Sequence, residues 1–411
     1  MNARKALDLD WVRRQFPALA TDEVFFDNAG GSQVYAGVAD RIRDYLLTTP
    51  VQLGASYARS EEATAKVLAA RRAVAAFINA PHDEAVVMGG STTSLLFQFA
   101  SALRSTIQPG DEVIVTDTDH EANVGCWKRL AEAGAVLKTW RVNRDTLELE
   151  LGDLDALLTS RTRWVAMTQA SNVLGTVNDV RAVADRVHAA GARLAVDAVA
   201  YAPHRLPDVA ASGADVYVFS FYKVFGPHYA VMAVERGLLL SLPGINHFFI
   251  GPDDMPYKLQ PGNVNFELSH GAAGIPEYLD AVAAHHGAGG MPRERWQAAY
   301  ALFAAQEDAL SARLLEYLRS KRGLRIIGRD RVARSDRVST IAFVKPGTAS
   351  ESLVRHVDRA RIGIRFGDFY ASHLIDALDL RDLGGVVRVS MLHYNTLDEL
   401  DRLIVALEGV L

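Results

Sequence analysis

The stretch VYVFSFYKVFGPHYAVMAV, residues 216–234, contains a single charged residue, Lys223, among apolar, aromatic, glycine and proline residues. A buried ammonium without a partner is costly, and burial therefore favours the neutral amine. A neutral amine is a nucleophile, and enzymes that store an aldehyde cofactor on a lysine require one. The alternative is a strand-end lysine whose stem lies on apolar surface while its ammonium reaches water. Taken alone, the stretch favours this simpler alternative.

Composition narrows the class of protein. The chain has 411 residues and 49% hydrophobic content, which is enough for a large core and two domains. Lys and Arg number 44 against 49 Asp and Glu, and the signs are mixed, so we expect no nucleic-acid or membrane partner. Residues 1–19 do not resemble a signal peptide, and the apolar runs are too short to span a bilayer. We therefore expect a cytoplasmic enzyme.

Cysteine and histidine usage gives no sign of a metal site. The single cysteine, Cys126, excludes an internal disulfide and a cysteine-rich metal centre. His285 and His286 are adjacent, but no carboxylate or cysteine spacing around them supports metal binding. We expect no metal in this protein.

From about residue 85 onward, short β-branched apolar runs alternate with longer amphipathic stretches, as in βαβ units. Helices are expected for STTSLLFQFASALRS, WKRLAEAG and VRAVADRVHAAG, which lie between the runs. Strands are expected at 85–89, 112–117, 163–169, 193–199 and 215–221. This alternation predicts the α/β class, as a three-layer sandwich with a mainly parallel sheet.

A second region follows the glycine-rich AHHGAGGMP, 284–292, which we interpret as a linker because it lacks the strand and spacing of a dinucleotide loop. A long helix is predicted over 293–321, followed by a strand, VSTIAFVK, and a terminal helix that Thr396 and Glu399 open as a capping box. We predict a large domain over 20–285 and a smaller α+β domain made of 1–19 and 286–411.

Polar residues follow several of the predicted strands. Ligands of open parallel sheets bind beyond the carboxyl ends of the strands, so these positions are informative. GGSTTS, 89–94, opens a helix, and its backbone amides with the hydroxyls of Ser91, Thr92 and Thr93 form a phosphate cradle or an ordinary N-cap. His120, in TDTDHEAN, follows the next strand; a lone histidine there is commonly a surface residue.

Three further strand ends complete the set. Asn172 lies in the turn QASNVLGT, which Gly175 helps to close, and Asp197 ends the apolar run RLAVDAV. A carboxylate in such a run requires a cationic or hydrogen-bonding partner. Together with Lys223, these residues would place an anion site, a planar group, an amide and an acid at one edge of the sheet. Pyridoxal phosphate requires this set of groups.

At this point the sequence resembles the class V aminotransferase family of fold type I pyridoxal phosphate enzymes, and within it the cysteine desulfurase and selenocysteine lyase group. The resemblance runs through FFDNAGGS (25–32), DHEAN, ASNVLGT, VDAV, SFYKVFGPH and RVSMLHYNT (388–396). It implies a sheet of the seven-stranded type, pyridoxal 5'-phosphate as cofactor, a small amino-acid substrate and a homodimer with active sites at the interface.

The resemblance also implies roles for individual residues. Lys223 corresponds to the Schiff-base lysine, Asp197 to the partner of the pyridine nitrogen, and His120 to the residue that stacks on the ring. Asn172 would lie near the phenolic oxygen, and Ser91, Thr92, Thr93 and Ser220 would contact the phosphate. In the family, a hydroxyl residue of the partner subunit also reaches the phosphate, for which the segment PGNVNFELSHGAAG offers Ser269 or His270.

Substrate contacts are implied in the same way. Arg388 matches the arginine that grips a substrate α-carboxylate, a task suited to a bidentate guanidinium; its alternative is a surface ion pair at a strand edge. Tyr370 and Asn28 are the other candidate substrate-binding residues.

Three departures from the desulfurase pattern concern the reaction. Tyr370 or a neighbour in GIRFGDFYASHL stands where desulfurases carry the nucleophilic cysteine, and Cys126 is expected to be a buried helix thiol. Ala200 replaces a side chain that bonds the cofactor oxygen, and Tyr222 replaces a common histidine. Because the cofactor-holding residues are kept, we expect a cofactor-competent enzyme with an altered reaction.

Lys223 is expected to remove the α-proton as general base, while Asp197 keeps the ring an electron sink. Three outcomes remain open: β-elimination by a C–S lyase without a persulfide cysteine, which we favour by analogy, transamination, or epimerisation of a small or aromatic amino acid. Epimerisation needs a second acid, for which Tyr370 or His120 are the candidates. A non-catalytic binding or regulatory protein is the competing class, and the retained Lys223, Asp197, His120 and Arg388 argue against it.

Overall fold

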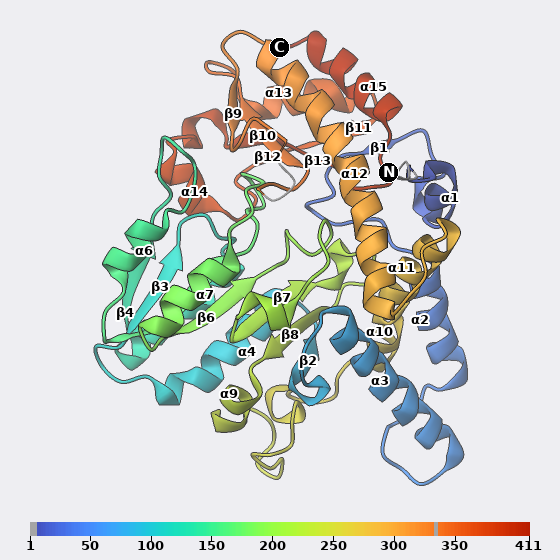
Figure 1. The fold of residues 1–411 in the computed structure, drawn as a ribbon, viewed down its shortest axis with the longest axis vertical. Coiled ribbons are helices and arrows are strands. Elements are labelled where there is room, and N and C mark those ends of the chain that lie inside the picture. Colours follow the sequence, from blue (N-terminus) through green and yellow to red (C-terminus); the bar gives the residue numbers. More distant parts are fainter. Residues whose placement is uncertain (1–5, 333–335) are drawn as a thin grey trace.

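A computed structural model describes residues 6–332 and 336–411, and its centre is a seven-stranded sheet (Figure 1). The strand order is β2-β8-β7-β6-β5-β3-β4. Only β8 runs antiparallel to its neighbours, and the other pairs are parallel. The strands are β2 (Val86–Gly89), β3 (Glu112–Thr116), β4 (Val136–Trp140), β5 (Thr162–Thr168), β6 (Arg193–Asp197), β7 (Val216–Ser220) and β8 (Ala230–Val234). The predicted α/β class and the mainly parallel sheet are confirmed.

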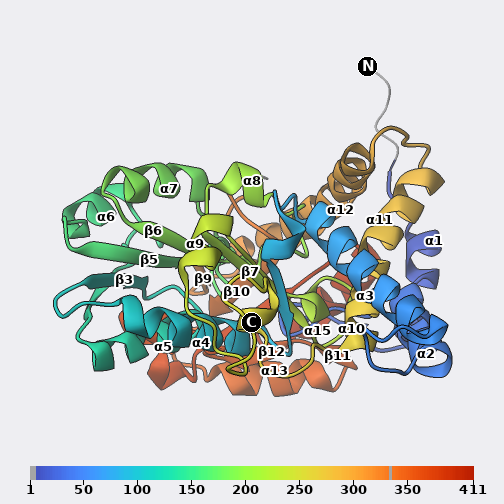
Figure 2. The ribbon, with the colours of Figure 1, turned by 90° about the horizontal axis from the view of Figure 1, so that it is seen from below.

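Both faces of this sheet are buried. In β7, Tyr217 and Phe219 belong to one apolar cluster, while Val216 and Val218 belong to another on the opposite face. Figure 2 shows the sheet edge-on between α6 and α7 on one side and α4 and α5 on the other. Parallel strands covered on both faces are apolar throughout, which explains the continuous apolar runs in the sequence. These helices are α4 (Thr92–Leu103), α5 (Ala122–Lys128), α6 (Leu151–Leu157) and α7 (Val180–Ala189).

A smaller antiparallel sheet, in the order β12-β13-β10-β9, lies at the other end of the molecule (Figure 1). Its strands are β9 (Arg325–Ile327), β10 (Thr340–Val344), β12 (Arg365–Gly367) and β13 (Val386–Ser390). Beside it, β1 (Val24–Phe25) from near the N-terminus pairs in parallel with β11 (Ile362–Gly363). The helices of this region are α13 (Ser350–Asp358), α14 (Ser372–Ala377) and α15 (Leu397–Glu408).

One long helix, α12 (Pro292–Ser320), connects the two sheets (Figure 1). Phe303 in its first half packs in the core of the large sheet, and Leu314 in its second half packs in the core of the small one. The helix therefore fixes the small sheet relative to the large one. The remaining helices are α1 (Leu9–Arg14), α2 (Ala36–Thr48), α3 (Ala58–Phe77), α8 (Val209–Ser212), α9 (Arg236–Ser241), α10 (Phe266–Ala272) and α11 (Gly274–His285).

The N-terminal segment contacts both cores. Val12 and Phe16 belong to the core of the large sheet, whereas Val24 and Phe26 pack with the small sheet. The boundaries that we predicted, 20–285 for the large domain and 1–19 with 286–411 for the small one, stay a prediction. Among the described residues, none of the helices is long and apolar enough to cross a membrane.

The terminal helix begins as the sequence predicts. Thr396 Oγ1 accepts a hydrogen bond from the Glu399 backbone N–H at 3.1 Å, and Glu399 Oε2 accepts one from the Thr396 N–H at 3.0 Å. These two bonds satisfy amide groups at the end of a helix whose residues Leu400 and Leu403 are fully buried.

Replacing Thr396 by Ala should lower the free energy of unfolding by about 1 kcal/mol, because the N-cap acceptor is lost. Urea denaturation followed by circular dichroism measures this change. Thr396→Ser keeps the hydroxyl and serves as the matched control. Equal stability of the alanine and serine variants would contradict a structural role for the cap.

Candidate active site

The turn between β2 and α4 brings hydroxyl groups to the carboxyl edge of the large sheet. Ser91 is the N-cap of α4, and its Oγ accepts a hydrogen bond from the Ser94 backbone N–H at 3.0 Å. Thr92 Oγ1 lies 2.7 Å from Oγ of Ser220, the last residue of β7, and both side chains are buried. Ser91 is thus used as a cap, whereas the hydroxyls of Thr92 and Ser220 join the first residue of α4 to the end of β7.

Asn172 is held by a turn that only glycine can close. Gly175 has φ +69°, and a Cβ atom there would lie 2.3 Å from the carbonyl oxygen of Thr340. The Asn172 side chain is buried, and its Nδ2 donates to the carbonyl oxygen of Phe369 at 2.9 Å. Its Oδ1 is buried without a hydrogen-bond partner among the described residues. This buried acceptor can therefore take a hydrogen bond from a ligand.

Lys223 is buried directly after β7, and it makes no hydrogen bond or ion pair within the described part of the chain. Burial, with the nearby Arg388 cation, lowers the pKa of its amine to about 8. Asp197, at the end of β6, accepts a bond from the Val199 N–H at 2.8 Å, and burial raises its pKa to about 6. At neutral pH Asp197 is mostly ionised, and Lys223 has a minor neutral fraction that increases as the pH approaches its pKa of about 8.

The imidazole of His120 is uncharged at neutral pH. Burial lowers the pKa of its imidazole to about 4, and the cations Lys223 and Arg388 contribute to this shift. Nδ1 accepts a hydrogen bond from the Ala122 N–H at 3.0 Å, so the neutral ring carries its hydrogen on Nε2. A neutral, fixed imidazole is suited to lie flat against an aromatic ring.

The residue before it, Asp119, was not among the predicted site residues. Its carboxyl is buried, and burial with the nearby Asp197 raises its pKa to about 8. Asp119 accepts hydrogen bonds from Thr116 Oγ1, from Asn123 Nδ2 at 2.6 Å and from the Thr168 N–H at 3.0 Å. This network fixes the loop that carries His120. In the sequence, only its position directly before His120 in the motif DHEAN could have indicated that Asp119 belongs to the site.

These groups meet in one pocket. Its volume is about 500 Å³, which includes the space at its open mouth. Eight of the ten predicted cofactor-binding residues line it, together with Ala200 and Tyr222, the two positions that depart from the desulfurase pattern. The complete lining is Ser91, Thr92, Thr93, His120, Ala122, Thr168, Ala170, Asn172, Asp197, Val199, Ala200, Ser220, Tyr222 and Lys223.

Ser269 and His270, the other two, are not brought to this pocket. Ser269 is fully buried in α10, where its Oγ donates to the Asn265 carbonyl oxygen at 2.6 Å. His270 is also buried, with its Nδ1 3.1 Å from Arg41 Nη2. Their predicted contact with the phosphate of a partner subunit stays a prediction.

The predicted substrate residues differ in their surroundings. Arg388 lies next to the pocket, where its Nη1 donates to the Asn172 carbonyl oxygen at 3.2 Å. The exposed ring of Tyr370 lies 5.2 Å from the ring of His120. Asn28 is not available for substrate: its amide is buried, donates to the Ser390 carbonyl oxygen at 2.9 Å and accepts from the Tyr394 hydroxyl at 2.5 Å.

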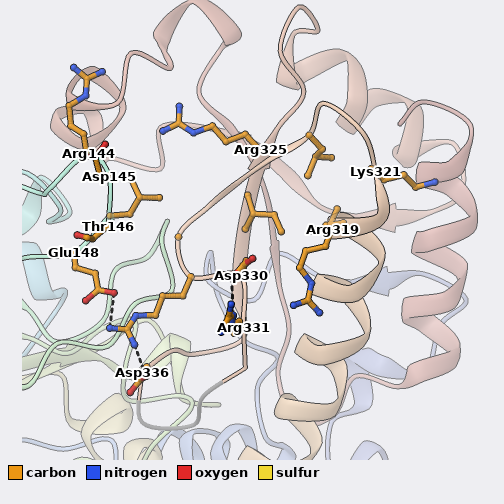
Figure 3. A pocket seen from close by; sticks show the side chains of 16 residues that line it. Arg144, Asp145, Thr146, Glu148, Arg319, Lys321, Arg325, Asp330, Arg331 and Asp336 are labelled. Carbon is orange, nitrogen blue, oxygen red and sulfur yellow. Dashed lines mark ion pairs between the residues drawn. The ribbon is translucent and has the colours of Figure 1, made fainter.

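A separate charged groove lies between residues 144–148 and the region around β9, and none of the predicted site residues lines it. Arg329 forms ion pairs with Glu148 and Asp336 at 2.7 and 2.5 Å. Figure 3 shows these two carboxylates among the side chains that line the groove. Because none of the predicted cofactor-binding or substrate-binding residues lines this groove, the pocket at the sheet edge is the candidate active site.

A buried lysine and an aspartate at adjacent strand ends of a seven-stranded, mainly parallel sheet define a fold type I pyridoxal phosphate enzyme. The sequence profile of the aminotransferase class-V family matches residues 24–246 and 273–403, and the chain belongs to this family.

Similar proteins agree with this assignment. The chain is 42% identical to the aminotransferase-like protein FGM3 of Gibberella zeae over 99% of each chain. It is 33% identical to the cysteine desulfurase-like protein ustD of Aspergillus flavus, over 96% of this chain and 88% of that protein. The solved structure of the cysteine desulfurase CsdA from Escherichia coli superposes with a TM-score of 0.83 at 26% identity, over 98% of each chain. The chain is therefore an enzyme whose cofactor is pyridoxal 5'-phosphate.

The pocket fits this cofactor. It offers hydroxyls at the N-terminus of α4 for a phosphate, a buried carboxylate for a ring nitrogen and an unpaired lysine for an aldehyde. A ligand here could satisfy the buried Asn172 Oδ1, which has no partner among the described residues, and could react with the amine of Lys223 in the pocket lining.

Cys126 lies in α5, and its thiol is completely buried. Burial raises its pKa far above the usual range, which removes the reactive thiolate. The native protein should therefore not react with Ellman's reagent, and one thiol per chain should appear after unfolding in guanidinium chloride. A native thiol that reacts as fast as free cysteine would contradict its assignment as a buried structural residue.

Proposed function

We propose that this enzyme is a C–S lyase that releases a thiol or sulfide from an L-amino acid by β-elimination without forming a persulfide. The observation that carries the proposal is the combination of a buried, partly neutral Lys223 with a pocket that no cysteine lines. Elimination requires one base that removes the α-proton, and it requires no thiol nucleophile.

The chain supplies the remaining parts of this reaction. When bound, pyridoxal phosphate supplies an electron-withdrawing ring that stabilises negative charge on the amino acid's α-carbon. Thr92, Thr93 and Ser220 would hold the phosphate, Asp197 would keep a proton on the ring nitrogen, and His120 would lie against the ring face. Arg388 would bind the substrate α-carboxylate.

Lys223 Nζ then takes the α-proton, the Cβ–S bond breaks with its electron pair leaving on sulfur, and the thiolate receives the proton that Lys223 holds. Addition of one water to the remaining three-carbon fragment gives ammonia and a keto acid, so atoms and charge balance. Lys223 returns the proton that it took, because a pKa near 8 allows both proton uptake and release at neutral pH.

Transamination is the second candidate, because Lys223 alone can move a proton from the α-carbon to another carbon. Epimerisation would need a second proton donor, and Tyr370, exposed and beside His120, is the side chain that favours this candidate. The proposed enzyme is a homodimer: Phe248 and Phe249, 99% and 67% exposed on one loop, are the kind of apolar surface that subunit contacts cover.

Lys223 should be the residue to which the cofactor attaches. The rate of its reaction with pyridoxal phosphate should rise with pH and reach half of its maximum near pH 8. The neutral amine is the nucleophile, and its fraction grows as the pH passes the pKa of about 8. Borohydride trapping of the apo-protein with pyridoxal phosphate, followed by peptide mass spectrometry, measures this rate against free N-acetyl-lysine.

Lys258 is the matched control, since it is also buried but its Nζ donates to three backbone carbonyl oxygens, including those of Leu242 and Pro252 at 2.8 Å. It should remain unlabelled. Loss of label in Lys223→Ala is expected, whereas label on Lys258 or a midpoint above pH 10 would contradict the assignment.

The reaction itself is tested by incubating the holoenzyme with L-cysteine and S-methyl-L-cysteine. Elimination predicts pyruvate, ammonia and sulfide or methanethiol in equal amounts, and none of them from Lys223→Ala. Stoichiometric conversion of the cofactor to its amine form, reversed by a keto acid, would instead support a transaminase. Accumulation of the D-amino acid would support an epimerase, and no spectral change with any amino acid would support a binding protein.

A further inference from the structure

Arg388 already holds a carboxylate. Its guanidinium is 2% exposed, and its Nη2 donates to Asp27 Oδ1 at 2.8 Å. The ring of Phe369 lies 3.7 Å below the guanidinium carbon, and Nη1 donates to a backbone carbonyl oxygen. The group proposed to bind the substrate α-carboxylate therefore already contacts an acidic side chain of the same chain through Nη2, while its Nε is buried without a hydrogen-bond partner among the described residues.

Asp27 has a second cation within reach. Its Oδ2 lies 3.5 Å from Nη1 of Arg365, whose side chain is 59% exposed. Arg365 and Arg388 are directly opposite each other on the antiparallel strands β12 and β13. Like charges in such a pair repel, and the carboxylate between them compensates both. The Asp27 side chain itself is 32% exposed, so it lies between a buried cation and an exposed one.

Because Arg388 is buried, it needs a carboxylate partner both before and after substrate binds. A buried guanidinium that loses its counter-charge is strongly destabilising, so Arg388 requires an anion whether or not substrate is present. Asp27 provides that anion in the empty site. A substrate carboxylate can replace it without leaving Arg388 unpaired, because Asp27 can stay with Arg365 near solvent.

We propose that Asp27 occupies the substrate-carboxylate position on Arg388 in the empty enzyme and passes to Arg365 when the substrate carboxylate binds. This inference rests on the proposed role of Arg388 in substrate binding. Asp27 acts here as a positioning and specificity residue. A ligand with a carboxylate can displace Asp27 from Arg388, whereas an amine without a carboxylate cannot. Binding of an amino acid is consequently weakened by the competition with Asp27.

The first test asks whether the position on Arg388 accepts a free carboxylate. Asp27→Ala removes the internal anion, so the variant should melt at a lower temperature than the original protein. Sodium acetate should restore at least half of this loss, and sodium chloride at equal ionic strength should restore much less. The double variant Asp27→Ala with Arg388→Met should show no rescue by acetate. Equal effects of acetate and chloride on Asp27→Ala would overturn the proposal.

The second test uses spectral titration of the holoenzyme with L-alanine and L-alaninamide, which differ only in the carboxylate. Asp27→Asn keeps the shape of the side chain and should tighten the apparent Kd for L-alanine about five- to tenfold, with little change for L-alaninamide. Arg365→Gln removes the second position of Asp27 and should weaken L-alanine binding. Weaker or unchanged binding of L-alanine to Asp27→Asn would overturn the proposal.

The two tests separate this inference from the proposed function. If L-alanine and L-alaninamide bind equally well to the original protein and to Arg388→Gln, Arg388 is not the substrate-carboxylate site, and the proposed exchange fails with it. The acetate rescue still reports, in that case, whether Asp27 is the removable counter-ion of Arg388.

Discussion

The active site depends on the burial of Lys223 at the end of β7. A lysine in this position must lie among groups that can tolerate its charge, and the surrounding residues are charged in a compensating pattern. Lys223 and Arg388 are buried cations, Asp197 and Asp27 are the nearby carboxylates, and burial keeps the third acid, Asp119, largely protonated at neutral pH. The resulting electrostatic balance explains why the pKa of Lys223 is lowered only to about 8.

A second constraint is the turn at Phe369 and Tyr370, where the resemblance to desulfurases would place a cysteine. Both residues have φ in the left-handed region, +54° and +58°, which is costly for large side chains. Their backbone oxygens accept hydrogen bonds from Asn172 Nδ2 and from the Glu121 N–H, next to His120. Phe369 also packs under Arg388. The turn thus holds three elements of the site together, and these contacts maintain its strained backbone.

Features that follow strand ends could be predicted from the sequence, because the carboxyl ends of parallel strands meet in space wherever they occur in the chain. The five predicted strands correspond to β2, β3, β5, β6 and β7, and the residues after them line one pocket. The strand β4 escaped prediction since it lies at the edge of the sheet and its sequence, VLKTW, is only partly apolar. The reversed direction of β8 has no signal in its apolar sequence, AVMAV.

Features that depend on distant partners could not be predicted in this way. Asn28 has the residue type of a ligand contact, but its hydrogen bonds are used by Ser390 and Tyr394, more than 360 positions away in the sequence. The pairing of Asp27 with Arg388 spans 361 positions, and a motif gives no indication of it. Ser269 has a suitable hydroxyl, but the register of α10 turns it into the core.

The proposed cofactor contacts and the proposed substrate contacts lie on different sheets. This separation would allow the reaction to change while the cofactor is kept. The proposed cofactor contacts follow strands of the large sheet, whose two buried faces leave little freedom for change. The groups proposed to act on the substrate, Arg388 and Tyr370, come from β13 and the turn before α14, and Arg365, the proposed second partner of Asp27, comes from β12. Asp27 follows β1, which pairs with β11 beside the small sheet. Tyr370, which the resemblance places where desulfurases carry a cysteine, lies in that region, and we therefore expect changes there to affect the substrate rather than Lys223 or Asp197.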